Sequence, residues 1–320
     1  MYTKYYKLND KKILVYGSKD SDKICETLEI NGAKVYKESI FQIILSLPIR
    51  ILKFFLLLKK INRNSINTKN FFSLSLTVFY LNLLNPNIVL SGLFLDIHYN
   101  KLAKIIISTR FIAIQIGSGN GKISFSNESR YKHWLEQGIS EFWILGNFFI
   151  QYFINEGLNY NKISVLGSLS NSLYIYKNNL EEPNYKIKKK YDLCIISNIK
   201  KEYPNYISNQ EFYMNLHKAV IKLNLNVVFA GRYSKKKDPS GYLMEKKYFD
   251  KYLGKKINFI EFDEFSTYRA SDESLVTIGD YTTALLESFA RGNKIIVVNT
   301  SKYKELNFFI DGVWDLKEYD

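Results

Sequence analysis

Three polar side chains in one short turn, Asp280, Thr282 and Thr283, are the strongest candidates for chemistry in this sequence. The turn joins a predicted strand at 274–279 to a predicted helix. Free backbone N–H groups and the positive end of the helix dipole meet at a helix N-terminus, so this position favours an anion such as a phosphate. Threonine is also a common N-cap, and simple capping of the helix explains the same residues.

A carboxylate follows this turn a little more than one helical turn later. Glu287 lies four to five residues beyond the threonines, which corresponds to about 6–7.5 Å along a helix. That is roughly the span from a diphosphate to a ribose, and a carboxylate at this place could accept hydrogen bonds from both ribose hydroxyls. The alternative interpretation is an ordinary exposed helix glutamate.

A basic residue ends another predicted strand of the second half, at 225–232. Arg232 could neutralise a pyrophosphate leaving group, and Gly231 before it would allow the backbone to approach a ligand closely. The alternative is an arginine in a solvated loop. Together with the turn at 280–283, these residues predict a binding site for a phosphorylated donor in the second half of the chain.

Candidate catalytic residues lie in the first half, after a predicted strand at 87–92. Asp96 and His98 follow this strand, and either could deprotonate an acceptor hydroxyl, because a general base needs a tunable pKa and reach to the substrate. Asp96 is equally well explained as the N-cap of a short helix. The sequence therefore does not decide between catalysis and capping for this residue.

A glycine-rich loop follows the predicted strand at 110–117. Its residues Gly117, Ser118 and Gly119 could cradle the acceptor or the sugar. The loop lacks the Lys-Ser/Thr ending of a nucleoside-triphosphate loop, which excludes kinase or ATPase chemistry of that type. We expect neither a metal nor a cofactor, because a helix dipole and an arginine can stabilise a leaving phosphate without one.

Strands that alternate with helix-length segments must position these residues. In the first half we predict strands at 11–17, 33–37, 87–92, 110–117, 141–147 and 162–168, and in the second half at 191–198, 225–232, 257–262, 274–279 and 293–298. Such alternation indicates crossover connections and parallel sheets. The predicted fold class is α/β, with an N-terminal Rossmann-like domain at 1–175, a linker at 176–190 and a second Rossmann-like domain at 191–320.

Composition narrows the function classes. The 320 residues carry a net charge of +14, which favours anionic partners, but no nucleic-acid-binding motif is present and we expect no nucleic acid partner. The two cysteines, Cys25 and Cys194, form no motif, which fits a reducing compartment. The first residues contain no apolar segment of export-signal length, so we expect a cytoplasmic protein.

The apolar segment 46–62 requires a membrane interpretation. Arg50 and Lys53 interrupt it, so it is predicted not to span a bilayer. Ser46 is expected to be the N-cap of a helix, with Pro48 in its first turn. Two interpretations remain: a mostly buried helix with a narrow polar edge, or a helix that lies on an anionic membrane surface.

The stretch GDYTTALLESFARGNKIIVVN resembles the donor-binding segment of GT-B glycosyltransferases and of related nucleotide-sugar epimerases. An acidic residue, small residues, a later Glu and a glycine stand at matching places, here Asp280, Thr282, Thr283, Glu287 and Gly292. The stretches FIAIQIGSGNG and FWILGNFFIQYFINEGLNYNKISVLGS are similar to those of the members that act in bacterial surface and capsular polysaccharide biosynthesis.

The resemblance implies two domains that face each other across a cleft. It further implies a metal-independent glycosyltransferase whose second domain holds a nucleotide-sugar donor and whose first domain binds a glycan or lipid-linked acceptor. Threonines in place of the usual glycines or serines, and the missing epimerase set of acids and histidines, make an epimerase a weaker alternative. A polyol-phosphate transferase or a non-catalytic scaffold protein with the same fold would also be consistent with this resemblance.

Overall fold

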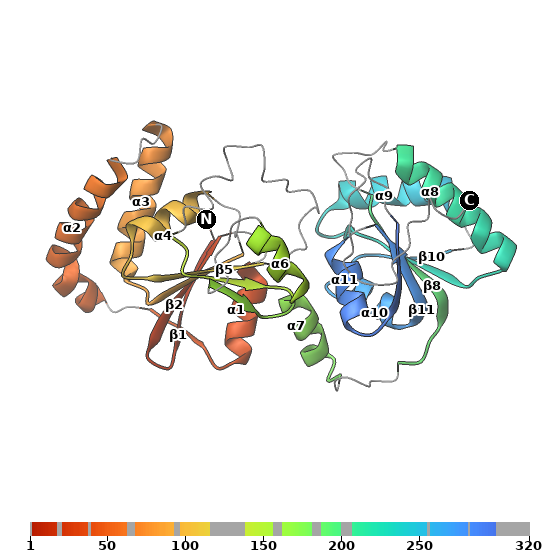
Figure 1. The fold of residues 1–320 in the computed structure, drawn as a ribbon, viewed down its shortest axis with the longest axis horizontal. Helices are drawn as coiled ribbons and strands as arrows, with labels where there is room; N and C mark the ends of the chain where they lie inside the picture. Colours follow the sequence, from red (N-terminus) through yellow and green to blue (C-terminus); the bar gives the residue numbers. More distant parts are fainter. Residues whose placement is uncertain are drawn as a thin grey trace. The chain divides into compact units, whose positions relative to one another are not determined.

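The computed structural model describes most of the chain in segments. The described residues are 2–17, 21–37, 40–62, 68–92, 97–115, 138–155, 162–180, 187–199, 207–254, 257–280 and 282–298. They form two compact units, and the chain passes from the first to the second between Leu173 and Tyr174. Each unit is built on its own sheet (Figure 1).

The first unit contains a seven-stranded sheet in the order β3-β1-β2-β4-β5-β6-β7. Its strands are β1 (Tyr2–Leu8), β2 (Lys11–Gly17), β3 (Lys34–Val35), β4 (Ile88–Ser91), β5 (Arg110–Ile114), β6 (Glu141–Ile144) and β7 (Ile163–Val165). Its helices are α1 (Ser21–Ile30), α2 (Ile40–Asn62), α3 (Thr68–Leu84), α4 (Ile97–Ile105) and α6 (Phe148–Asn155), and α7 (Leu169–Lys177) runs on into the second unit. From β2 to β7 neighbouring strands are parallel.

Helices cover both faces of this first sheet. In β5, Ile112 and Ile114 belong to a buried cluster with Ile24 of α1. Phe111, which precedes them in the strand, packs edge-on against Tyr99 of α4 with the ring centres 5.4 Å apart. Because consecutive side chains of a strand point to opposite faces, α1 and α4 lie on opposite sides of the sheet.

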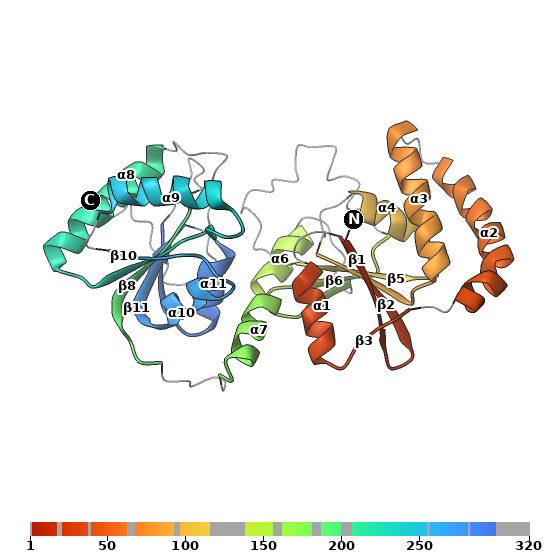
Figure 2. The ribbon, with the colours of Figure 1, turned by 180° about the vertical axis from the view of Figure 1, so that it is seen from behind.

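The antiparallel strand β1 was not predicted from the sequence. It pairs along its whole length with β2, through a turn in which Asn9 has a φ of 52°. Its other edge carries β3, also antiparallel (Figure 2). The alternation in YTKYYKL and the Asn-Asp pair that follows it are signals for a hairpin, and they were available in the sequence.

The helix predicted from Ser46 begins earlier than expected. α2 starts at Ile40, so Ser46 is not an N-cap and Pro48 lies inside the helix. A proline there removes one backbone hydrogen bond and crowds the preceding turn. The apolar residues before Ser46 extend the helix toward its N-terminus in spite of this cost.

The second unit contains a five-stranded parallel sheet in the order β10-β9-β8-β11-β12. Its strands are β8 (Tyr191–Ile196), β9 (Val227–Ala230), β10 (Asn258–Ile260), β11 (Ser274–Gly279) and β12 (Lys294–Val297). Its helices are α8 (Ile207–Leu223), α9 (Pro239–Tyr252), α10 (Ser266–Asp272) and α11 (Thr283–Ala290). The strand order reverses between β8 and β11, as it does in doubly wound sheets.

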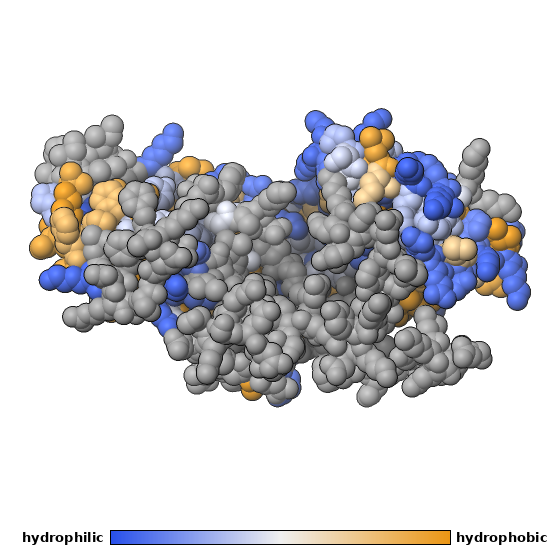
Figure 3. Space-filling view, turned by 90° about the horizontal axis from the view of Figure 1, so that it is seen from above, coloured by the Kyte–Doolittle hydropathy of each residue, from blue (hydrophilic) through white to orange (hydrophobic). Residues whose placement is uncertain are grey.

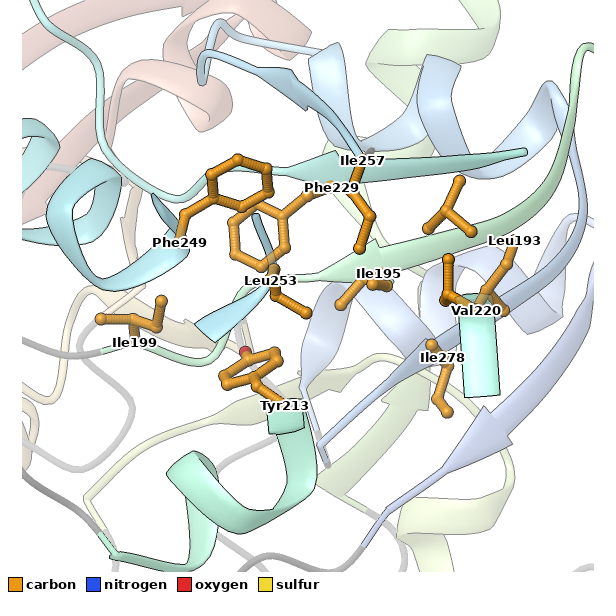
Figure 4. Close-up of a cluster of buried hydrophobic side chains, with 11 residues drawn as sticks. Leu193, Ile195, Ile199, Tyr213, Val220, Phe229, Phe249, Leu253, Ile257 and Ile278 are labelled. Atoms are coloured by element: carbon orange, nitrogen blue, oxygen red, sulfur yellow. The ribbon is translucent and has the colours of Figure 1, made fainter. Parts of the chain in front are cut away.

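Alternate residues of β8 contribute to two cores on opposite faces of this sheet. Leu193 and Ile195 belong to the larger core, to which α8 and α9 contribute Tyr213, Val220 and Phe249 and the C-cap of α9 contributes Leu253 (Figure 4). Cys194 and Ile196 pack on the other face with residues of α10 and α11. The predicted fold class of two doubly wound Rossmann-like domains is therefore confirmed for the two units taken individually.

Candidate functional site

The carboxyl ends of β8 and β11 meet where the strand order of the second sheet reverses. Open α/β sheets bind ligands at this edge, because the two connections leave the sheet toward opposite faces. Asn198 follows β8, and its side-chain amide donates a hydrogen bond to the carboxylate of Asp280, which follows β11. The predicted donor residue Asp280 is thus held at the reversal point by a partner that no sequence motif indicated.

Thr282 is the N-cap of α11. Its backbone is extended, with φ −133° and ψ 152°, and its hydroxyl oxygen accepts a hydrogen bond from the backbone N–H of Leu285 at 3.3 Å. Thr283 is the first residue of the helix. The capping alternative for Thr282 is therefore realised, and both threonines stand at the helix N-terminus where the sequence placed them. A phosphate at this helix end stays a prediction.

Glu287 is not the exposed helix glutamate that the alternative interpretation expected. Its side chain is buried, with 6% of its surface exposed, and its Oε2 accepts a hydrogen bond of 2.6 Å from the hydroxyl of Tyr268 in α10. A carboxylate can accept several donors, so a further bond from a ligand hydroxyl is compatible with this one. The tyrosine holds the carboxylate in one orientation.

A buried ion pair stands behind Tyr268. The guanidinium of Arg291 lies 4.6 Å from the centre of the Tyr268 ring and 5.3 Å from that of Tyr174. Its Nε donates to both carboxylate oxygens of Asp272, at 2.9 and 3.1 Å, and both side chains of the pair are almost fully buried. The arrangement fixes Tyr268, and with it Glu287, between α10 and α11. No sequence motif indicated these residues, because they meet only in three dimensions.

Gly231 and Arg232 occupy the carboxyl end of β9, next to β8 in the sheet. Gly231 is buried, and a Cβ at this position would lie 2.9 Å from the carbonyl oxygen of Ile260 in β10. The glycine is therefore needed for close approach of the protein's own backbone. The side chain of Arg232 is exposed, with its guanidinium 5.9 Å from the centre of the Tyr233 ring.

Of the candidate residues in the first unit, the structure describes His98. His98 is half-buried in the first turn of α4, next to Tyr99, whose hydroxyl lies 2.8 Å from the carbonyl oxygens of Val89 and Ile112. Asp96 and the loop residues Gly117, Ser118 and Gly119 lie outside the described residues. The predicted donor residues of the second unit follow the carboxyl ends of β9 and β11 in the same sheet, whereas the candidate residues of the first unit stay predictions.

Within the described part of the chain, no group of three or more His, Cys, Asp or Glu side chains is arranged to hold a metal ion. Over the same residues, no helix is long and apolar enough to cross a membrane. Cys25 and Cys194 are both free and buried, one in each unit.

Comparison with known proteins gives similarity in structure alone. No family model matches the sequence, and no curated protein does. The UDP co-structure of MnaA from S. aureus aligns with a TM-score of 0.47 at 14% identity, over 73% of this chain and 62% of that one. A putative UDP-N-acetylglucosamine 2-epimerase from Listeria monocytogenes gives 0.48 at 13% identity, over 75% and 64%.

A glycosyltransferase from Rickettsia africae ESF-5 also aligns, with a TM-score of 0.41 at 14% identity, over 74% of this chain and 64% of that one. The chain spans less than two thirds of the length of these three structures. None of these similarities assigns a substrate to this chain.

Proposed function

We propose that the protein is a glycosyltransferase of the GT-B type that binds a nucleotide-sugar donor at the carboxyl edge of its second sheet. It transfers the sugar to a glycan or lipid-linked acceptor bound by the first unit, in the assembly of a surface polysaccharide. The reaction needs no metal, because the N-terminus of α11 and Arg232 can stabilise the charge of the leaving diphosphate.

One observation carries this proposal. A helix N-terminus capped by Thr282 and a buried, oriented carboxylate at Glu287 lie on the same short helix, directly after the strand at the reversal point. The first suits a phosphate, and the second suits the hydroxyls of a ribose one helical turn away. Asp280, held by Asn198, stands at the start of this arrangement.

The first test is a thermal-shift panel on the full chain with UDP-, CDP-, CMP- and GDP-linked sugars, followed by product analysis with and without an acceptor extract. Stabilisation by one nucleotide class and release of its nucleotide only when acceptor is present would support the proposal. Conversion of the sugar nucleotide without any acceptor would assign an epimerase instead. No stabilisation by any nucleotide would favour a non-catalytic scaffold.

We further propose that the first unit works at an anionic membrane surface, with α2 as the contact. Four large apolar side chains of this helix are mostly exposed: Ile49 at 72%, Leu52 at 65%, and Phe55 and Leu56 at 58% each. In Figure 3 orange spheres gather at the left end of the view, over α2 and α3. The expectation of a mostly buried helix is therefore wrong for this part of α2.

Charge favours a lipid surface over other partners for this exposed face. Residues 39–95 contain six Lys and Arg and no Asp or Glu. An apolar helix face in a segment that carries cations and no anions matches the interface of a bilayer with anionic headgroups. Arg50 is directed differently, because its guanidinium donates to the carbonyl of Leu83 at the end of α3.

Sedimentation of the full chain with vesicles tests this part of the proposal. Pelleting with vesicles that contain phosphatidylglycerol, weaker pelleting with phosphatidylcholine alone and loss of binding at high salt are the expected results. Equal pelleting with both kinds of vesicle, or none, would contradict it.

A further inference from the structure

A buried acid that none of the donor-site motifs includes lies beside the predicted donor site. Glu245, on the second turn of α9, has 0% of its surface exposed. Burial raises the pKa of this carboxyl, and hydrogen bonds from Ser197 and from the backbone N–H groups of Arg232 and Tyr233 oppose the rise. Burying a carboxyl group away from water is costly, so its partners indicate what it does.

The partners of Glu245 come from the ends of two neighbouring strands. The N–H of Arg232 lies 2.9 Å from both Oε1 and Oε2, and the N–H of Tyr233 lies 3.2 Å from Oε2. The hydroxyl of Ser197, directly after β8, donates to Oε1. One carboxylate thus joins the turn after β9 to the turn after β8.

The packing around this carboxylate is tight. A Cβ on Gly231 would lie 3.0 Å from Oε2 of Glu245, in addition to its short contact with the carbonyl oxygen of Ile260. Since the backbone N–H groups of Arg232 and Tyr233 turn inward to Glu245, these two amides are not the ones that would face a ligand. The side chain of Arg232 is left exposed at the edge of the sheet.

Through Ser197, Glu245 is also linked to the point where the strand order of the sheet reverses. Ser197 precedes Asn198, whose amide holds the carboxylate of Asp280 after β11. Fixing Ser197 therefore limits the movement of Asn198, and Asn198 limits that of Asp280. Three adjacent strand ends, those of β9, β8 and β11, depend on the place of one buried side chain.

We propose that Glu245 is a positioning residue of the donor site, which fixes the turns after β8 and β9 so that the guanidinium of Arg232 is held where a diphosphate binds. This inference rests on the proposed function for the identity of the ligand. It does not rest on it for the geometry, because the hydrogen bonds of Glu245 exist without a ligand.

The test is a double-mutant cycle on the full chain, with UDP and uridine as probes in isothermal titration calorimetry. The variants are Glu245→Gln, Arg232→Ala and the double variant. Because the N–H of Arg232 is equally close to both carboxylate oxygens, the amide NH2 of Glu245→Gln must face a backbone N–H, so the turn shifts while the volume is kept. Asp250→Asn is the matched control, because it makes the same change on the exposed side of α9.

We expect Glu245→Gln to weaken UDP binding about tenfold, as for residues that share one network. It should leave uridine binding unchanged and add little to Arg232→Ala. Wild-type affinity for UDP in Glu245→Gln, or a loss that simply adds to that of Arg232→Ala, would overturn the inference. A merely structural role would weaken UDP and uridine alike.

Hydrogen–deuterium exchange separates this inference from the proposed function. In Glu245→Gln the amides of Arg232 and Tyr233 should exchange faster than in the wild type and in Asp250→Asn, with no ligand present. Unchanged exchange at these two amides would overturn the positioning role whether or not UDP binds. If the wild-type protein binds no nucleotide but these two amides still exchange faster in Glu245→Gln, the proposed function is contradicted. The role of Glu245 in fixing the two turns is then supported.

Discussion

The two units differ in which side chains they bury and which they expose. At the strand ends of the second unit, polar groups are buried and bonded to one another, as in the pairs Tyr268–Glu287 and Asn198–Asp280. On α2 of the first unit, large apolar side chains such as Ile49 and Leu52 are exposed to solvent. A fixed polar edge suits a small charged ligand, whereas an exposed apolar helix needs an extended partner.

The difference is one between residues that hold a small binding site in one geometry and residues that form an exposed contact surface. In the second unit, the buried acids Glu245, Asp272 and Glu287 accept hydrogen bonds from neighbouring groups, and hydrophobic cores lie on both faces of the sheet. In the first unit, the apolar residues of α2 add little to the fold through their exposed faces.

The largest expected effect concerns the exposed face of α2. Replacing Leu52 and Phe55 together by Glu should lower binding to phosphatidylglycerol vesicles about a hundredfold, since each apolar side chain contributes about 1.5–3 kcal/mol when buried. The folded stability should change little because both side chains are exposed. Vesicle sedimentation and urea unfolding measure the two quantities.

The control for this prediction lies in the second unit. Met214 and Leu243 are also exposed apolar residues, at 47% and 65%. The double replacement of these two by Glu makes the same charge change and should leave vesicle binding nearly unaltered. Equal loss in both double variants would mean that net charge alone, and not the α2 face, drives binding.

The next effect tests the polar edge of the second unit through Glu287. Glu287→Gln should weaken UDP binding about tenfold to a hundredfold, because hydrogen bonds to a charged group contribute about 1.5–3 kcal/mol each and those to a neutral group less. Calorimetry with UDP measures it. Tyr268→Phe, which keeps the carboxylate but removes its partner, should have a smaller effect.

Glutamine is a better probe here than alanine. Because Glu287 is buried and bonded to Tyr268, Glu287→Ala would leave the tyrosine hydroxyl without this acceptor and lower the stability of the free protein. If a folded Glu287→Gln protein bound UDP with unaltered affinity, the predicted role of Glu287 would be contradicted. The threonines of the turn would then be explained as ordinary helix caps.

The fold could be predicted from the sequence better than the site, and the reasons are physical. Short apolar runs separated by helix-length segments identified every strand that pairs in parallel in the described sheets, because such a pattern is local in the sequence. β1 was missed because its sequence, YTKYYKL, lacks the continuous apolar run by which the other strands were identified. The donor turn at Asp280 and Thr282 was found because strand, turn and helix are contiguous in the chain.

The partners of that turn could not be read from the sequence. Tyr268 is 19 residues from Glu287, and Glu245 is 48 residues from Ser197. These pairs follow from the strand order and from how α9 and α10 pack on the sheet. Local propensity carries no information on such contacts, so the sequence identifies candidates one by one and the structure joins them.

A smaller effect on stability is expected from replacing a glycine that has close neighbours, in comparison with a glycine that has free space beside it. Gly231→Ala should destabilise the protein by about 1–3 kcal/mol, because its Cβ would meet Ile260, Glu245 and Phe259. A Cβ on Gly146 in the first unit would meet nothing within 4 Å. Urea unfolding of Gly231→Ala and Gly146→Ala should show a loss for Gly231→Ala alone, and equal stabilities would contradict the packing at the β9 end.

The smallest expected effect is a pH dependence of stability. Burial raises the pKa of Glu245, which faces Ser197, Arg232, Tyr233 and Tyr213. Because the pKa is higher in the folded than in the unfolded state, the contribution of this group to the free energy of unfolding is complete at low pH. It is lost as the pH rises through the pKa of the folded state. Glu245→Gln does not ionise, so its stability relative to wild type should improve as the pH is raised from about 4 to about 8. A constant difference in urea unfolding over this range would contradict the shift.

The most direct measurement for the central claim is hydrogen–deuterium exchange of the full chain with and without UDP. If the carboxyl edge of the second sheet is the donor site, UDP should slow exchange in the first turn of α11, from Thr283 to Glu287, while the exposed face of α2 stays unaffected. Slowing confined to the first unit, or no slowing at α11 at UDP concentrations that saturate the protein, would contradict the account.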